Sequence, residues 1–214
     1  MKTSIILTHW AQNEFRSRLM RECVQSIVST APEAECIVID NGGNASDSTY
    51  LLEHCERKNI ACYIRNRHNM SFAFGYNQGE KIATGDYLVF TSNDIVFENG
   101  WLEECIGFLE THQGKYLATP LAIDRLHDCQ RYQRGAVDGW TLNAAAGSNV
   151  FVVRKKDFQI IGEFENKALA GTKWMQRYSK MGYVMACMPV PKAKDMAFKE
   201  GFRNIPKHAY QTTL

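Results

Sequence analysis

Two aspartates that follow apolar runs are the strongest candidates for chemistry in this sequence. Asp40 ends the run at residues 36–39 and precedes Asn41 and two glycines, and Asp94 follows the run at residues 87–91. A carboxylate at such a position can accept hydrogen bonds from a base or a ribose, which we expect of Asp40. It can also hold a divalent cation that neutralises a diphosphate, which we expect of Asp94. The pair predicts a site for a nucleotide and a metal ion.

A third stretch, residues 69–77, lies between these aspartates and reads Asn-Met-Ser-Phe-Ala-Phe-Gly-Tyr-Asn. Its small residues permit a ligand to approach the backbone closely. Each of the three features has an ordinary structural interpretation, because an aspartate after a strand often forms a turn or a helix cap. Their combination favours a binding site.

Short apolar runs alternate with amphipathic segments through the first hundred residues. We expect strands at residues 4–8, 36–39, 61–65 and 87–91, and helices at 15–28, 48–55 and 74–83. This alternation predicts a parallel sheet with right-handed crossovers, in which ligands bind beyond the carboxyl ends of the strands. Residues 8–10, 40–41 and 92–94 are therefore expected to be neighbours.

The second half of the chain has a less regular pattern. We expect helices at residues 101–109, 155–160 and 172–181, strands at 116–123, 149–153 and 183–189, and an irregular polar stretch at 124–139. Residues 192–214 are basic and lack an apolar period. We expect this tail to be a loop that covers part of the molecule.

The composition is that of one globular domain. The 214 residues carry a formal charge of +2 and are 45% hydrophobic, a balance that gives no general footprint for nucleic acid. The seven cysteines form no C-x-x-C pair, which favours reduced thiols. No apolar run approaches the roughly 18 residues of a membrane span, and the N-terminus lacks a signal-peptide core. We expect a cytoplasmic protein without stable membrane insertion.

Together these motifs resemble a family 2 glycosyltransferase of the GT-A fold, nearest the rhamnosyltransferase-like branch. The matching stretches are residues 4–8 with 19–27, 37–41, 69–79 and 83–96, and weaker agreement continues at 100–102, 147–154 and 180–183. The resemblance implies an α/β nucleotide-diphospho-sugar transferase fold, with a Rossmann-like, mostly parallel sheet flanked by helices. It divides the single domain (1–214) into a nucleotide-sugar-binding half (1–100), an acceptor half (101–190) and a basic tail (191–214).

The resemblance also implies roles for particular residues. The donor would be a UDP-, GDP- or dTDP-sugar, held by Thr8, His9, Asp40, Asn41, Asn69, Asn77, Asn93 and Asp94. Asp94 would be the principal ligand of Mn²⁺ or Mg²⁺, which stabilises the leaving diphosphate as a Lewis acid. His208 in the tail is our candidate for an additional metal ligand, and an exposed histidine in a loose tail is the alternative.

Three positions depart from the family pattern. Ser92-Asn93-Asp94 leaves one carboxylate in the DXD-type element, and Ser71 stands where a glycine is common. Ala170 and Gly171 stand where inverting members usually carry the Glu-Asp pair that supplies the catalytic base. A displaced carboxylate could serve instead, and the candidates are Asp138, Glu163, Glu165 and Asp195. The chain could also be a retaining enzyme, or an inactive relative.

The acceptor is left open, with recognition expected in residues 125–141 and 167–180. A glycan, a protein, a lipid-linked sugar and a DNA base are all compatible with the aromatic and Arg side chains there. A decayed GT-A domain that binds a sugar or a partner is one alternative function. A nucleotidyltransferase is the other, but residues 8–12 lack the Gly-rich, basic phosphate loop that it would normally carry after the first strand.

Overall fold

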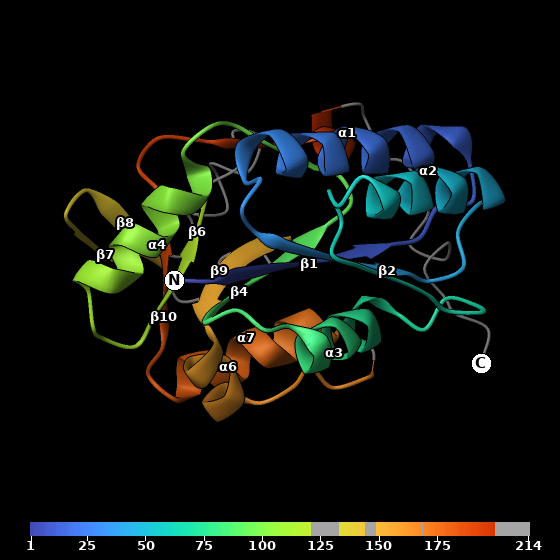
Figure 1. The fold of residues 1–214 in the computed structure, drawn as a ribbon. Helices are drawn as coiled ribbons and strands as arrows, with labels where there is room; N and C mark the ends of the chain where they lie inside the picture. The colour runs from blue at the N-terminus through green and yellow to red at the C-terminus, as the bar shows by residue number, and fades with distance from the viewer. Residues whose placement is uncertain (121–132, 144–148, 168, 200–214) are drawn as a thin grey trace.

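A computed structural model describes residues 1–120, 133–143, 149–167 and 169–199. A nine-stranded sheet forms the centre of the molecule, with the strand order β3-β2-β1-β4-β9-β6-β10-β8-β7. Helices α1, α2 and α4 lie on one face of this sheet, and α3, α6 and α7 lie on the other (Figure 1). A separate two-stranded ladder joins β5 to β11.

The elements have the following bounds. The strands are β1 Thr3–His9, β2 Glu35–Asp40, β3 Cys62–Arg65, β4 Tyr87–Ser92, β5 Ile95–Phe97, β6 Tyr116–Thr119, β7 Gln133–Val137, β8 Trp140–Asn143, β9 Val150–Arg154, β10 Val184–Cys187 and β11 Ala193–Asp195. The helices are α1 Glu14–Thr30, α2 Ala45–Glu56, α3 Phe72–Ile82, α4 Trp101–Thr111, α6 Lys155–Ile161, α7 Ala170–Lys180 and α8 Met196–Lys199.

The first four strands of the large sheet are parallel, as the alternating pattern predicts. β1 pairs in parallel with both β2 and β4, and β2 pairs in parallel with β3. The second half is mixed, because β9 runs antiparallel to β4 and β6, and β8 runs antiparallel to β10 and β7. β10 nevertheless pairs in parallel with β6, so parallel pairing is not confined to the first half.

Two glycines of the 69–79 stretch bring α3 against β1. A Cβ atom on Gly79 would lie 2.4 Å from Cγ2 of Ile6, and one on Gly75 would lie 2.7 Å from Cγ2 of Thr8. The small residues at 69–77, Gly75 among them, are expected to leave space for a ligand, and Gly79 lies just outside that stretch. At these two positions the glycines instead allow a helix to pack closely on a strand.

Aromatic side chains fill the core beneath α3, α6 and α7. Phe90 of β4 stacks on Phe151 of β9 and Phe158 of α6, with ring centroids 5.1 and 4.9 Å apart. Phe164 and Trp174 close this cluster with a centroid separation of 4.8 Å. Aromatic contacts of this kind stabilise the pairing of the two halves of the chain.

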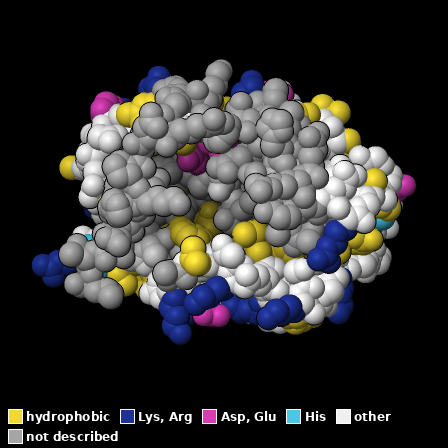
Figure 2. Space-filling view, turned by 180° about the vertical axis from the view of Figure 1, so that it is seen from behind, with side chains coloured by type: hydrophobic (Ala, Val, Ile, Leu, Met, Phe, Trp, Pro, Cys, Tyr) yellow, Lys and Arg dark blue, Asp and Glu magenta, His cyan; other side chains and the backbone are white. Residues whose placement is uncertain are grey.

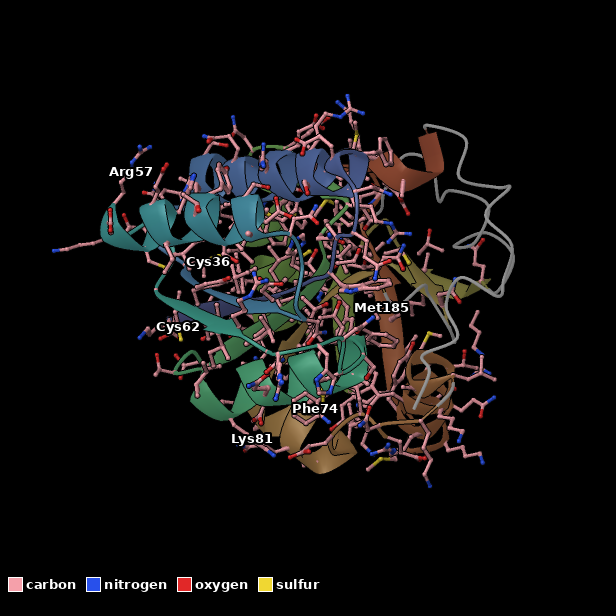
Figure 3. The ribbon with its side chains drawn as sticks, turned by 90° about the vertical axis from the view of Figure 1, so that its right-hand side faces the viewer. Cys36, Arg57, Cys62, Phe74, Lys81 and Met185 are labelled. Atoms are coloured by element: carbon pink, nitrogen blue, oxygen red, sulfur yellow. The ribbon has the colours of Figure 1, made fainter. Side chains whose placement is uncertain are left out.

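The six cysteines that the structure describes are free thiols, as expected. Cys36 and Cys62 come from the neighbouring strands β2 and β3 (Figure 3). Burial raises the pKa of the Cys36 thiol to about 12, with a smaller contribution from Cys55. A thiol with so high a pKa stays protonated and unreactive at neutral pH.

Two expectations for the second half were wrong. Within the stretch expected to be irregular, β7 forms a hairpin with β8, and the turn between them has positive φ at Asp138 and Gly139, as a type I′ turn requires. Within the expected loop at 192–214, Ala193–Asp195 forms β11, which pairs with β5. Residues 200–214 lie outside the described part of the chain.

Candidate functional site

The carboxyl ends of three parallel strands bring the predicted motifs together. In the ladder register His9 lies opposite Asp40, and Thr8 lies opposite Ser92. The backbone N–H of Asn41 also donates to the carbonyl oxygen of His9, at 2.7 Å. The prediction that these three segments are neighbours is confirmed.

Asp94 lies in the turn between β4 and β5. The Ser92 hydroxyl donates to its carboxylate, and its backbone carbonyl accepts from Met196 N–H at 2.9 Å. The second bond continues the β5–β11 ladder, in which Asp195 lies opposite Ile95. Two aspartates more than a hundred residues apart in the sequence therefore lie at adjacent positions of one ladder.

The Asp195 carboxylate belongs to the same small cluster. This side chain is 1% exposed, and its Oδ2 accepts from the amide of Asn149 at 3.0 Å. Asn149 in turn accepts from the backbone N–H of Ser92 at 2.9 Å. Ser92 and Asn149 thus connect the two carboxylates, and Asp195 is the one proposed base that the structure places beside Asp94.

This cluster fits a hard divalent cation. Mg²⁺ and Mn²⁺ prefer oxygen ligands, and Mg²⁺ is commonly held by one or two carboxylates together with substrate phosphates. Cys23 lies close by, but burial and the charge of Asp94 raise its pKa well above its ordinary value, so it offers no thiolate. Among the described residues no group of three or more His, Cys, Asp or Glu side chains could hold a metal, and His208 lies outside them.

Acidic side chains are visible on the back of the molecule, next to residues that the structure does not describe (Figure 2). Lys and Arg side chains gather in the lower part of the same view (Figure 2). Acidic groups suit a cation and basic groups suit a phosphorylated ligand, so this distribution of charge is compatible with a metal and a nucleotide on one face.

A buried hydrogen-bonded chain leads from α2 to the Asp94 turn. His9 bonds through Nε2 to Asp47 Oδ2 at 3.1 Å, and through Nδ1 to the Asn93 amide nitrogen at 3.0 Å. Asp47 is not among the predicted site residues. The sequence does indicate that Asp47 faces inward, because it precedes the buried Leu51 by four residues and so lies on the same face of α2.

Asp40 is fully buried and has three partners within the chain. Its Oδ1 accepts from Gly43 N–H at 2.7 Å, and its Oδ2 accepts from the Tyr63 hydroxyl at 2.9 Å and from Arg65 at 2.7 Å. Asn41 likewise bonds to the carbonyl of Ser71. The predicted contacts of Asp40 and Asn41 with the donor stay predictions.

Asn69 and Asn77 hold neighbouring loops. Asn69 accepts from Ser71 N–H at 2.9 Å, and Ser71 has a φ of 80°, which explains why a glycine is common at its position. Asn77 binds both backbone groups of Phe164, at 2.8 and 3.0 Å. A donor role for either asparagine stays a prediction, and each has a structural role that the sequence analysis did not anticipate.

Asp138 is far from this edge of the sheet. It lies in the β7–β8 turn, is 72% exposed and bonds to His112 at 3.0 Å. Four strands separate β7 from β4, which corresponds to about 24 Å at the usual strand spacing. The structure does not bring Asp138 to Asp94.

Glu163 and Glu165 lie on the loop between α6 and α7. Glu163 pairs with Lys81 of α3 at 3.5 Å, and Glu165 pairs with Lys173 and Arg177 of α7 at 3.7 and 3.8 Å. Both carboxylates are accessible, with exposed fractions of 51% and 44%. Both carboxylates can therefore be reached by a ligand from solvent.

Within the described residues no helix has the length and apolar character to cross a membrane.

Solved structures of low sequence identity share this fold. S. aureus TarS (residues 1–349) superposes with a TM-score of 0.68 at 15% identity, over 92% of this chain and 61% of that one. GalNAc-T7 in complex with UDP, GalNAc and Mn²⁺ superposes with a TM-score of 0.71 at 12% identity, over 91% of this chain and 44% of that one. The mannosyltransferase PcManGT from Pyrobaculum calidifontis, in complex with GDP-Man and Mn²⁺, superposes with a TM-score of 0.68 at 15% identity, over 89% of this chain and 57% of that one. The expected GT-A fold is confirmed.

Sequence comparison identifies the family. A putative polypeptide N-acetylgalactosaminyltransferase 13 of Drosophila melanogaster is 31% identical over 129 residues, which cover 54% of this chain and 22% of that protein. The chain thus spans about a fifth of this curated relative. The family model for glycosyl transferase family 2 matches residues 6–141, which include the β1, β2 and β4 ends. The chain belongs to glycosyl transferase family 2.

Proposed function

We propose that this chain is a glycosyltransferase that moves a sugar from a nucleoside-diphosphate sugar to an acceptor, with Mn²⁺ or Mg²⁺ at Asp94. The carrying observation is the adjacency of Asp94 and Asp195 at the carboxyl end of β4, where ligands of open α/β sheets bind. Family membership and neighbours solved with UDP or GDP-Man and Mn²⁺ support the same function.

In this proposal Asp94 is the principal metal ligand, and Asp195 supplies a second carboxylate next to it. The bound cation would offset the negative charge that the leaving nucleoside diphosphate develops. Ser92 and Asn149 orient the two carboxylates through the hydrogen bonds described above. Asn93, in the same β4–β5 turn, contributes a polar side chain that can contact the nucleotide-sugar.

Glu165 is our choice for the catalytic base. The position usual for that base holds Ala170 and Gly171 at the start of α7, and both residues are buried. Glu165 precedes them by a few residues. Its ion pairs with Lys173 and Arg177 of α7 hold it near the start of this helix. An accessible carboxylate there can take the proton of an acceptor hydroxyl.

A binding module without transferase activity is the second candidate. The observation that favours it is again the absence of a carboxylate at residues 170–171. A module of this kind would bind the nucleotide-sugar with its metal and leave it intact. Donor hydrolysis or transfer therefore separates it from the enzyme.

The first experiment measures donor binding by calorimetry and thermal shift. UDP-, GDP- and dTDP-sugars are tested with and without Mn²⁺, because a ligand that binds the folded state raises its stability. We expect one donor to bind in a metal-dependent way, and Asp94→Asn to abolish that dependence. Glu98→Gln is the matched control, since Glu98 is an exposed carboxylate of the same β5–β11 region paired with Lys194. The absence of any shift in the wild type would contradict the proposed function.

A further inference from the structure

We propose that Asp47 is a positioning residue that fixes, through His9, which end of the Asn93 side-chain amide faces the donor site. The inference rests on the proposed function and deepens it. It concerns a residue of α2 that lies behind the site, and it assigns a direction to every hydrogen bond between that residue and the Asp94 turn.

The first step is the charge on Asp47. Its side chain is fully buried and accepts from the Ser17 hydroxyl at 2.7 Å, from His9 Nε2 at 3.1 Å and from Arg21 at 3.3 Å. Burial raises the pKa of this carboxyl, but the hydrogen bonds from His9 and Ser17, together with the charge of Arg21, outweigh it and hold the pKa below its usual value. Asp47 is therefore ionised, and an ionised carboxylate can only accept hydrogen bonds.

The second step is the tautomer of His9. Because Asp47 can only accept, the proton of the His9–Asp47 bond is carried by Nε2. A neutral imidazole with its proton on Nε2 has an acceptor at Nδ1. The Asn93 amide nitrogen lies 3.0 Å from Nδ1 and supplies the matching donor. The ring is buried, so its polarity is set by these two partners.

The third step is the Asn93 amide. With its nitrogen directed at His9, its oxygen Oδ1 points the other way. In the part of the chain that the structure describes, Oδ1 makes no hydrogen bond. Asn93 immediately precedes Asp94, so Oδ1 is an available acceptor at the donor site. It suits a hydroxyl of the nucleotide-sugar or a water bound to the cation.

Replacing the carboxylate by an amide should reverse this polarity. In Asp47→Asn the new amide N–H can donate to His9 Nε2, which moves the ring proton to Nδ1. Asn93 must then turn its oxygen toward His9 and present its NH₂ group to the site. The substitution keeps the size and burial of residue 47. At the nucleotide-sugar site, however, it replaces a hydrogen-bond acceptor of Asn93 with a hydrogen-bond donor.

Nuclear magnetic resonance of ¹⁵N-labelled histidine tests the relay without any ligand. We expect His9 to carry its proton on Nε2 in the wild-type protein at neutral pH, and on Nδ1 in Asp47→Asn. A wild-type His9 with its proton on Nδ1, or with both nitrogens protonated, would overturn the proposal. The wild-type spectrum needs no variant to fold, and neither spectrum needs a donor to bind, so this readout is independent of the proposed function.

Donor affinity tests the consequence. Mutating a residue that orients a metal ligand typically costs about 10–100-fold in metal affinity or activity, and we expect a loss of similar size in the affinity of Asp47→Asn for the Mn²⁺–nucleotide-sugar. Ser17→Ala is the matched control, because it removes a neutral hydrogen bond to the same carboxylate oxygen without reversing the His9 proton. Equal losses in the two variants would contradict the relay.

A double-mutant cycle separates positioning from general destabilisation. If Asp47 acts through Asn93, Asp47→Asn should change donor affinity by less than about twofold in an Asn93→Ala background. A full loss in that background would mean that Asp47 acts by another route. If the wild-type protein binds no nucleotide-sugar at all, the proposed function fails, and the histidine spectra alone decide the relay.

Discussion

Asn77 and Phe164 are joined by a reciprocal pair of hydrogen bonds, although 87 residues separate them. The Asn77 amide donates to the Phe164 carbonyl at 2.8 Å, and its oxygen accepts from the Phe164 N–H at 3.0 Å. This pair attaches α3 to the loop that carries Glu163 and Glu165. It also holds the Phe164 ring in the aromatic core against Trp174.

Asn77→Ala should remove both bonds and leave two backbone groups of Phe164 without partners. We expect the free energy of unfolding to fall by about 1–3 kcal/mol. Asn77→Asp retains the acceptor for the Phe164 N–H but sets a second oxygen against the Phe164 carbonyl, so it should cost at least as much. Urea denaturation measures the unfolding free energy of both variants, and calorimetry measures their affinity for the nucleotide-sugar. A loss of donor affinity with unchanged stability would favour the donor role predicted from the family resemblance.

Gly79→Ala should disturb the contact between α3 and β1. The new Cβ would lie 2.4 Å from Cγ2 of the buried Ile6, so the helix or the strand must shift, at a cost of about 1–3 kcal/mol. Gly107→Ala in α4 is the matched control, because its Cβ would meet nothing within 4 Å. We expect the free energy of unfolding of that control to rise by about 0.5–1 kcal/mol, because alanine is the better helix former. Thermal denaturation compares the two, and similar changes in both would refute the packing argument.

Ser71 has a backbone conformation that favours glycine, with φ 80° and ψ 158°. Its hydroxyl accepts from Phe74 N–H and donates to Asn166. Ser71→Ala and Ser71→Gly both lose these bonds, but only the glycine relieves the backbone strain. We therefore expect Ser71→Ala to be less stable than Ser71→Gly by about 1–3 kcal/mol. Equal stability of the two variants in urea denaturation would show that the position is not strained.

Glu35 should make the stability of the protein depend on pH in the acid range. Burial raises its pKa, but hydrogen bonds from Ser4 and Thr84 and the charge of Lys2 lower it from the usual 4.5 to about 2. Since the folded protein has the lower pKa, this stabilisation is complete above pH 4.5 and is lost as the pH falls toward 2. The difference in unfolding free energy between wild type and Glu35→Gln should narrow over that interval. A difference that is constant from pH 6 to pH 2.5 would contradict this assignment.

Elements that depend on local pattern could be predicted from the sequence. The run at residues 36–39 falls inside β2, and the run at 87–91 falls inside β4, because strands buried on both faces must be continuously apolar. The carboxyl-end rule then placed Asp40 and Asp94 at one edge of the sheet without any knowledge of the connecting loops. The part of the site built on these parallel strands was predictable for that reason.

Elements that depend on partners distant in the sequence could not be predicted in the same way. β7 is exposed and polar, and only the Asp138-Gly139 dipeptide signals its hairpin. β11 has three residues and forms against β5, so its own sequence carries almost no information. The placement of Asp195 beside Asp94, rather than in a loose tail, follows from that ladder alone.

The β5–β11 ladder also sets an order of events during synthesis. A ribosome reaches residue 195 a further 101 residues after Asp94, which at about 5–20 residues per second takes roughly 5–20 s. During that interval β1, β2 and β4 can pair, but the second carboxylate has not yet been translated. A nascent chain can therefore build the sheet edge formed by β1, β2 and β4 well before it can complete the pair of aspartates.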